Sequence, residues 1–222
     1  MKRCATTFLV SVLLATMVLT ANAYTLRAPQ VVFSSAPLQS YFNGLGEGFN
    51  VATDQADIQV WSTNVTGNSD FTLVLKNGVQ DEIGIYNSAD PLPNLYLIFP
   101  PGAAASWSAY VQFIAGNLKV SLYDNTATFQ GTTVYSGVSS ASFAFYLKSA
   151  NGTYFSQDYR NGRPMVLTYA GVSNPGDWWL CFQDVPYPLL SSAFDSAVID
   201  IQSVRPVPVR ATSFGHLKSL YR

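Results

Sequence analysis

Apolar and polar residues alternate along most of the chain between Tyr24 and Val204. A spacing of two places one row of side chains on a buried face of a β-sheet and the next row toward solvent. The pattern therefore predicts a series of short β-strands. The alternating apolar positions are Ile58 and Val60; Phe71, Leu73 and Leu75; Leu118, Val120 and Leu122; Phe143, Phe145 and Leu147; and Ile199 and Ile201.

Turn-forming pairs separate these groups. The clearest is Asn151-Gly152, which predicts a hairpin between residues 143–148 and 153–159. Roughly ten short strands with such turns between them are typical of sandwiches and barrels. We therefore expect an all-β fold, a single antiparallel β-sandwich that is jelly-roll-like.

One segment departs from the strand pattern. Between Pro37 and Asn50, the residues Leu38, Tyr41 and Phe42 have helical spacing and precede a glycine. This spacing predicts one short N-terminal helix. Because no repeat or change of composition divides the chain, we expect one sandwich domain over residues 24–204.

The first 23 residues have the organisation of a signal peptide. Basic residues at Lys2 and Arg3 precede an apolar run from Phe8 to Leu19, and Ala21-Asn22-Ala23 is a small-x-small cleavage pattern. A membrane anchor is the alternative, but the run is shorter than the roughly 20 residues that span a bilayer. We expect cleavage before Tyr24, and a secreted or cell-surface protein without a transmembrane segment in its mature chain.

The end of the chain is predicted to lie outside the domain. Prolines space residues 205–210 as an extended linker, and Phe214, Leu217 and Tyr221 share one face of a short helical pattern. The tail over residues 205–222 is either a sorting signal or a basic tail, and the sequence leaves both open.

Composition excludes one class of partner. Charged residues make up 11% of the chain, and 12 Lys and Arg face 13 Asp and Glu, whereas about 25% is usual in soluble domains. Binding to nucleic acid through phosphate neutralisation needs an excess of basic side chains. We therefore expect no nucleic-acid partner.

The residues do not form a recognisable catalytic group. Cys181 is the only cysteine after the signal peptide, and it lies in the apolar run Trp178–Phe182, so an internal disulfide is impossible. The single histidine, His216, lies in the tail, and Asp81 and Glu82 are neighbours whose side chains would point to opposite faces of a strand. We therefore expect a protein that is not an enzyme.

Five segments carry the pattern of a known family in the same order: Leu38–Leu45, Val51–Gln55, Gly84–Asn87, Phe143–Leu147 and Trp178–Val204. Together they resemble the bacterial exoprotein family called domain of unknown function 4114, of the type associated with PEP-CTERM tails, although the PEP-CTERM tail itself is missing. The resemblance covers about residues 30 to 204 and implies an exported, extracellular protein.

The resemblance also points to a metal site. The family has an acidic loop whose clustered carboxylates suit Ca²⁺. Here only Asp184 and Asp195 remain as acidic ligands, with Gln183 where the family has a glutamate. Because a calcium site usually needs more charge, we expect Asp184 to accept hydrogen bonds from its own loop, and calcium to be a less favoured alternative.

A second candidate site is Asp177 with Trp178 and Trp179. Aromatic rings beside a carboxylate suit contact with a sugar, but alternation turns one tryptophan inward and leaves at most one free. Three functions follow from these observations. The favoured one is a non-enzymatic binding or adhesion domain at the cell surface or in the extracellular matrix; the others are a lectin-like module for polysaccharide and a hydrolase with an unrecognised site.

Overall fold

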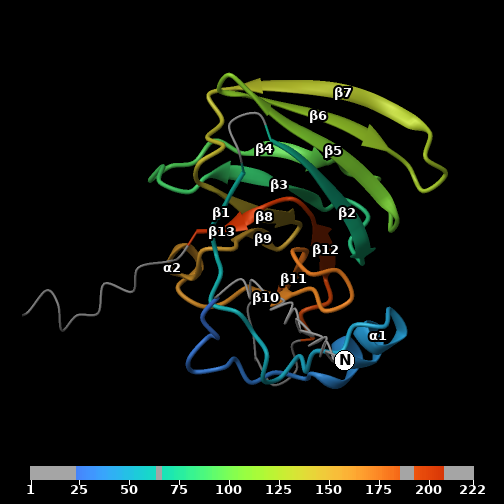
Figure 1. Ribbon diagram of the computed structural model, residues 1–222, viewed down its shortest axis with the longest axis vertical. Helices are drawn as coiled ribbons and strands as arrows, with labels where there is room; N and C mark the ends of the chain where they lie inside the picture. The colour runs from blue at the N-terminus through green and yellow to red at the C-terminus, as the bar shows by residue number, and fades with distance from the viewer. Residues whose placement is uncertain (1–23, 64–66, 186–192, 208–222) are drawn as a thin grey trace, which may run out of the picture.

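The fold is known from a computed structural model, which describes residues 24–63, 67–185 and 193–207. Two antiparallel β-sheets pack face to face (Figure 1). The predicted all-β sandwich is therefore confirmed. The signal peptide and residues 208–222 of the predicted tail lie outside the described residues.

The larger sheet has seven strands in the order β10-β11-β12-β2-β5-β6-β7. Its first strand along the chain, β2, lies near the middle of the sheet, and later strands add on both sides. The strands are β2 (Asn68–Lys76), β5 (Trp107–Ile114), β6 (Asn117–Tyr123), β7 (Phe129–Ser136), β10 (Val166–Ala170), β11 (Trp178–Phe182) and β12 (Ala197–Ile201).

The smaller sheet has the order β13-β1-β8-β3-β4, and β9 also pairs with β8. The hairpin predicted around Asn151-Gly152 is confirmed, because Ser149 of β8 pairs with Gly152 of β9. The strands are β1 (Trp61–Ser62), β3 (Glu82–Asn87), β4 (Tyr96–Phe99), β8 (Phe143–Ser149), β9 (Gly152–Phe155) and β13 (Arg205–Pro206).

Strand β13 corrects the predicted end of the domain. Arg205 and Pro206 pair with β1, and the amide of Val207 donates to the carbonyl of Val60 at 2.9 Å. The linker prediction was wrong for these residues because proline, although it cannot donate, is accepted on an edge strand.

The core between the sheets contains most of the predicted alternating positions. Phe113 of β5 stacks on Phe143 of β8 with ring centroids 5.2 Å apart. Leu75 and Val60 are exceptions: Leu75 packs with the cluster on the outer face of the larger sheet, and Val60 packs in a separate cluster with Tyr86 and Tyr146. The pairing of β12 with β2 shifts its register between Val198 and Ile199, and such a bulge changes which face the following side chains occupy.

A third layer covers part of the larger sheet. The predicted helix is present as α1 (Ala36–Gly44), with Pro37 in its first turn. Leu38 and Phe42 of α1 are buried against Tyr169 and Trp179, on the face of β10 and β11 that points away from the sandwich. In Figure 1 the blue N-terminal segment and α1 accordingly lie beyond β10 and β11.

A buried ion pair joins this N-terminal layer to the short helix α2 (Asp158–Asn161). The Arg27 guanidinium lies 2.5 Å from the carboxylate of Asp158, and the Arg27 side chain is 7% exposed. The Gln59 side-chain amide donates to the same carboxylate oxygen at 3.2 Å. The contact fixes the start of the chain to residues more than a hundred positions later.

No helix in the described part of the chain is long and apolar enough to cross a membrane.

Candidate functional site

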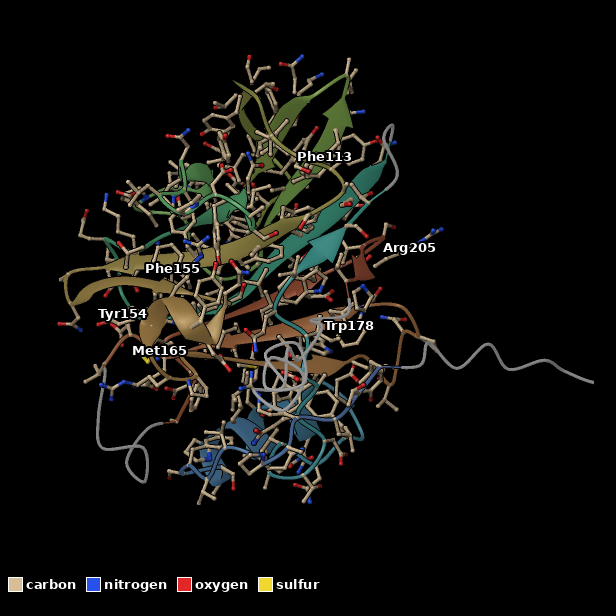
Figure 2. The ribbon with its side chains drawn as sticks, turned by 90° about the vertical axis from the view of Figure 1, so that its left-hand side faces the viewer. Phe113, Tyr154, Phe155, Met165, Trp178 and Arg205 are labelled. Carbon is tan, nitrogen blue, oxygen red and sulfur yellow. The ribbon has the colours of Figure 1, made fainter. Side chains whose placement is uncertain are left out.

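The structure buries both tryptophans of the predicted sugar site. Trp178 lies between the two sheets and is 2% exposed, with its ring edge-on to Tyr24 at 5.2 Å (Figure 2). Trp179 points to the opposite face, where Phe42 of α1 covers it at 5.2 Å and leaves it 8% exposed. Neither ring therefore offers a face to a ligand, although alternation alone leaves one of them free.

Asp177 lies in a tight loop before β11. Its backbone carbonyl accepts from Gly171 at 2.8 Å and its amide donates to Asn174 at 3.1 Å. Burial, with a smaller contribution from the charge of Glu47, raises the pKa of its carboxyl. The loop thus places Asp177 beside another acid instead of beside an exposed ring.

The side chains of the predicted calcium site have other partners. Asp184 accepts a hydrogen bond from the hydroxyl of Ser196 at 2.7 Å and one from the amide nitrogen of Asn151 at 3.3 Å. The Gln183 side-chain oxygen accepts from the amide of Phe194 at 3.0 Å. The contacts of Asp184 with Ser196 and of Gln183 with Phe194 join the two ends of the loop between β11 and β12.

The backbone of Asp195 is also hydrogen-bonded at this end of the loop. Its carbonyl oxygen accepts a hydrogen bond from the Asn77 side chain at 2.7 Å. Calcium requires six to eight oxygen ligands, several of them carboxylates. The described residues contain no group of three or more His, Cys, Asp or Glu side chains that could hold a metal. Calcium binding therefore stays the less favoured prediction, and in the described residues Asp184 and Gln183 already accept hydrogen bonds from protein groups.

A different surface presents binding chemistry. The apolar cluster beneath the N-terminal layer contains no residue of β5, β6 or β7, so this layer covers only one half of the outer face of the larger sheet. We call the other half the open face. It consists of Asn68, Asp70 and Thr72 on β2, Ser108, Tyr110, Gln112 and Ile114 on β5, Asn117, Lys119, Ser121 and Tyr123 on β6, and Phe129, Thr132, Val134 and Ser136 on β7.

Strand register fixes which of these side chains are neighbours. One row across the sheet is Asp70, Tyr110, Ser121 and Thr132, because each of these residues pairs with the next. Directly paired residues in antiparallel strands place their side chains on the same face, about 4.5–5.5 Å apart. The open face is therefore a grid of mainly hydroxyl, amide and aromatic groups on four adjacent strands.

Few of these polar groups bond to one another. Gln112 donates to Asn68 at 3.2 Å, and the hydroxyls of Ser121 and Thr132 lie 3.0 Å apart. The ring of Tyr123 packs against the ring of Phe129 at the edge, with centroids 5.6 Å apart. Ser121 is 7% exposed, so the groups available to a ligand are those of its half-buried and exposed neighbours.

The sequence carries the signal for this surface in β5. Ser108, Tyr110 and Gln112 alternate with the buried Ala109, Val111 and Phe113. The alternation predicts an outward-facing polar row, but it does not indicate whether this row contacts solvent or another layer. Sequence reasoning missed the open face because the partial cover by α1 is a tertiary contact.

An aspartate marks the boundary between the covered and open halves. Asp200 of β12 lies between Trp179 of β11 and Thr72 of β2 in the register. Its side chain is 9% exposed; one oxygen accepts from Gln202 at 2.8 Å, and the other is buried without a hydrogen-bond partner. Burial raises the pKa of Asp200 to about 6; the hydrogen bond from Gln202 lowers it, and the charges of Asp177 and Glu47 raise it further.

We expect Asp200→Asn to stabilise the protein at neutral pH. The raised pKa means that the folded chain holds this proton more tightly than the unfolded chain. The stability that the proton provides is therefore full below the unfolded value of 3.8 and is lost as the pH rises to about 6. Removing the carboxylate should raise the free energy of unfolding at pH 7 by about 2 kcal/mol.

Thermal unfolding between pH 4 and pH 7 measures this effect. The wild-type midpoint should fall across this range more steeply than that of Asp200→Asn. Gln202→Ala, which removes a hydrogen bond that lowers the pKa, should make the fall steeper. Equal pH slopes for Asp200→Asn and the wild type would contradict the assignment.

Comparison with known proteins adds little to these observations. No family model matches the chain, and no curated protein matches it, so the resemblance to domain of unknown function 4114 stays a prediction. Among solved structures, the C-terminal domain of the BC2L-C lectin from Burkholderia cenocepacia is similar with a TM-score of 0.27 and 13% identity, covering 68% of this chain and 97% of that domain. At this TM-score the likeness assigns neither a fold family nor a ligand to the chain.

Proposed function

We propose that this chain is an exported, non-enzymatic β-sandwich that binds extracellular polysaccharide through the open face. The observation that carries the proposal is the grid of hydroxyl, amide and tyrosine side chains on β2, β5, β6 and β7, which no apolar residue of the N-terminal layer reaches. Binding of this kind would retain the protein at the cell surface or in the extracellular matrix.

The residue types on the open face match the chemistry of a sugar. A pyranose ring has apolar C–H patches and a rim of hydroxyl groups. The half-buried rings of Tyr110 and Tyr123 supply apolar contact with a hydroxyl at the tip. Gln112 and Asn68 supply amide groups that both donate and accept.

Charge and dimensions point to a polymer with little net charge. The open face carries one acidic residue, Asp70, and one basic residue, Lys119, so their formal charges cancel. Neighbouring strands are about 4.8 Å apart, so four strands span about 15 Å. A strip of this length suits several linked sugar units better than one.

The adjacent acids Asp81 and Glu82 do not form a hydrolytic pair. The Glu82 carboxylate bonds to Lys148 at 3.1 Å on the surface. Asp81 is 4% exposed, and its amide donates to Gly78 at 3.2 Å within the turn before β3. The two side chains therefore lie in separate environments, Glu82 on β3 and Asp81 in the turn before it.

We expect Tyr110→Ala and Gln112→Ala each to weaken polysaccharide binding by about tenfold, the usual effect of truncating a central contact. The ligand is first identified on an array of bacterial and plant polysaccharides, and affinity is then measured by calorimetry. Tyr110 and Gln112 are only partly buried, so both variants should unfold within a few degrees of the wild type.

The matched control is Tyr159→Ala. Tyr159 is 68% exposed on α2, away from the open face. Its removal should leave the affinity unchanged. Equal affinities for the wild type, Tyr110→Ala and Gln112→Ala would refute the open face as the binding site, and an array without any bound polysaccharide would refute the proposed ligand class.

A further inference from the structure

Strand β7 forms one edge of the larger sheet (Figure 1). Seven of its eight residues pair with β6, and no other strand in the described part of the chain pairs with it. An edge strand carries a row of backbone amides and carbonyls that can pair with another chain, and proteins usually protect such edges. How each edge of this sandwich is protected therefore shows whether β7 is unusual.

The opposite edge of the larger sheet is covered. Ala56 donates its amide to the carbonyl of Thr168 in β10 at 2.8 Å, and the Thr168 hydroxyl donates to the carbonyl of Ala56 at 2.9 Å. The segment before β1 thus occupies the free side of β10. A further strand cannot pair there without displacing it.

The edges of the smaller sheet are short or blocked. Strand β4 has four residues and is followed directly by Pro100, and β13 has two residues, one of them Pro206. At β9 the side chain of Asn161 accepts from the amide of Phe155 at 2.9 Å and donates to its carbonyl at 2.7 Å. Each of these features limits pairing with another strand.

Strand β7 lacks the cover, the brevity and the proline of the other edges, and the bulge in its pairing, opposite Leu122 and Tyr123, affects only its first residues. Residues 129–136 contain neither proline nor a charged side chain. Phe129 and Val134 are 56% and 60% exposed, although both are large and apolar. An uncharged, exposed strand of this length is the kind of edge that pairs with another strand.

Turn geometry shows which backbone groups of β7 face outward. Ala115 and Gly116 both have positive φ, 49° and 80°, and join β5 to β6 as a two-residue turn that makes Ile114 and Asn117 a hydrogen-bonded pair. Hydrogen-bonded and non-hydrogen-bonded pairs then alternate along β6, so the backbone amides and carbonyls of Leu118, Val120 and Leu122 point toward β7. Their partners in β7 are Tyr135, Thr133 and Gly131. The amides and carbonyls of Thr132 and Val134 consequently point away from the sheet.

We propose that β7 pairs antiparallel with β7 of a second copy of this chain, which joins the two larger sheets into one. A second copy fits because an uncharged strand meets no like charge when it pairs with itself. A two-fold axis also limits the assembly to two chains, because the described part of each copy has one unprotected strand edge.

The pairing would also bring the two open faces together. A two-fold axis perpendicular to the sheet keeps both outer faces on the same side. The dimer would then present one continuous surface, and a polymer could contact both halves at once with higher avidity. This consequence depends on the proposed polysaccharide binding, whereas the dimer itself does not.

The test measures oligomeric state without any ligand. Light scattering and sedimentation of the chain purified after export should show a mass of two chains that dissociates on dilution. Val134→Glu places a charge on the edge while facing Lys119 of its own sheet, and we expect it to raise the dissociation constant by about tenfold or more. Thr132→Pro removes an outward-facing amide and should have the same effect.

Val79→Glu is the matched control. Val79 is 71% exposed in the turn between β2 and β3, so the substitution adds the same charge to an equally open valine. This variant should dimerise like the wild type. A monomer at all concentrations, a higher oligomer, or a dimer that resists both edge substitutions while all variants stay folded would overturn the proposal.

Discussion

Substituting Gly84 by alanine should prevent stable folding of the sandwich. Gly84 lies in β3, and a Cβ atom built there would be 2.1 Å from the backbone carbonyl oxygen of Tyr96 in β4 and 2.8 Å from the ring of Tyr146. The register of β3 with β4 shifts between Ile83 and Gly84, so the two backbones approach closely at this point. Because the nearest atom belongs to a backbone, relief requires moving a whole strand. We expect a loss of at least about 4 kcal/mol.

Thermal and urea unfolding measure this loss. Gly44→Ala is the control, since no atom lies within 4 Å of a Cβ atom at this last residue of α1 and its φ is not positive. This second substitution should be neutral or stabilise by about 0.5 kcal/mol. A Gly84→Ala protein that unfolds within a few degrees of the wild type would show that the strands at Gly84 are farther apart than described.

Truncating Trp178 should weaken the fold strongly without defining a ligand site. The side chain is fully enclosed between the sheets beside Tyr24. Large-to-small changes of buried aromatic residues typically cost about 3–5 kcal/mol. For a protein of this size, such a loss in Trp178→Ala corresponds to a fall of about 10 °C in the unfolding midpoint.

Measuring binding and unfolding together distinguishes an aromatic residue that stabilises the core from one that contacts a ligand. Below its own midpoint, Trp178→Ala should keep its affinity for the polysaccharide that the wild type binds. Tyr110→Ala should show the reverse pattern, with a nearly unchanged midpoint and a weaker affinity. If Trp178→Ala instead abolished binding while retaining the wild-type midpoint, the ring would belong to a ligand site.

The strands could be predicted from the sequence because their period of two is a local property. Phe143, Phe145 and Leu147 lie between the sheets as the alternation requires. Leu75 lies on the other face because of a bulge in its pairing with β12, and neither strand shows that irregularity by itself. Fold class was therefore predictable, whereas the exact face of individual side chains was not.

The candidate sites were harder to predict because they depend on contacts between distant segments. Trp179 is an outward-pointing residue of β11, and a sheet with a free outer face would expose it. Phe42, more than a hundred residues earlier, covers it instead. The same layer stops before β5, and this limit makes the row around Tyr110 accessible. The alternation predicts an outer row, but not which part of the row another layer covers.

The position of the N-terminal layer also bears on the order of folding. Helix α1 is among the first parts of the described chain to be synthesised, yet it packs on Tyr169, Trp179 and Val198. These residues are synthesised after about three quarters of the chain is complete. The layer therefore cannot dock until β10, β11 and β12 exist, and such long-range contacts slow folding. This early part of the described chain is thus expected to be among the last to reach its final place.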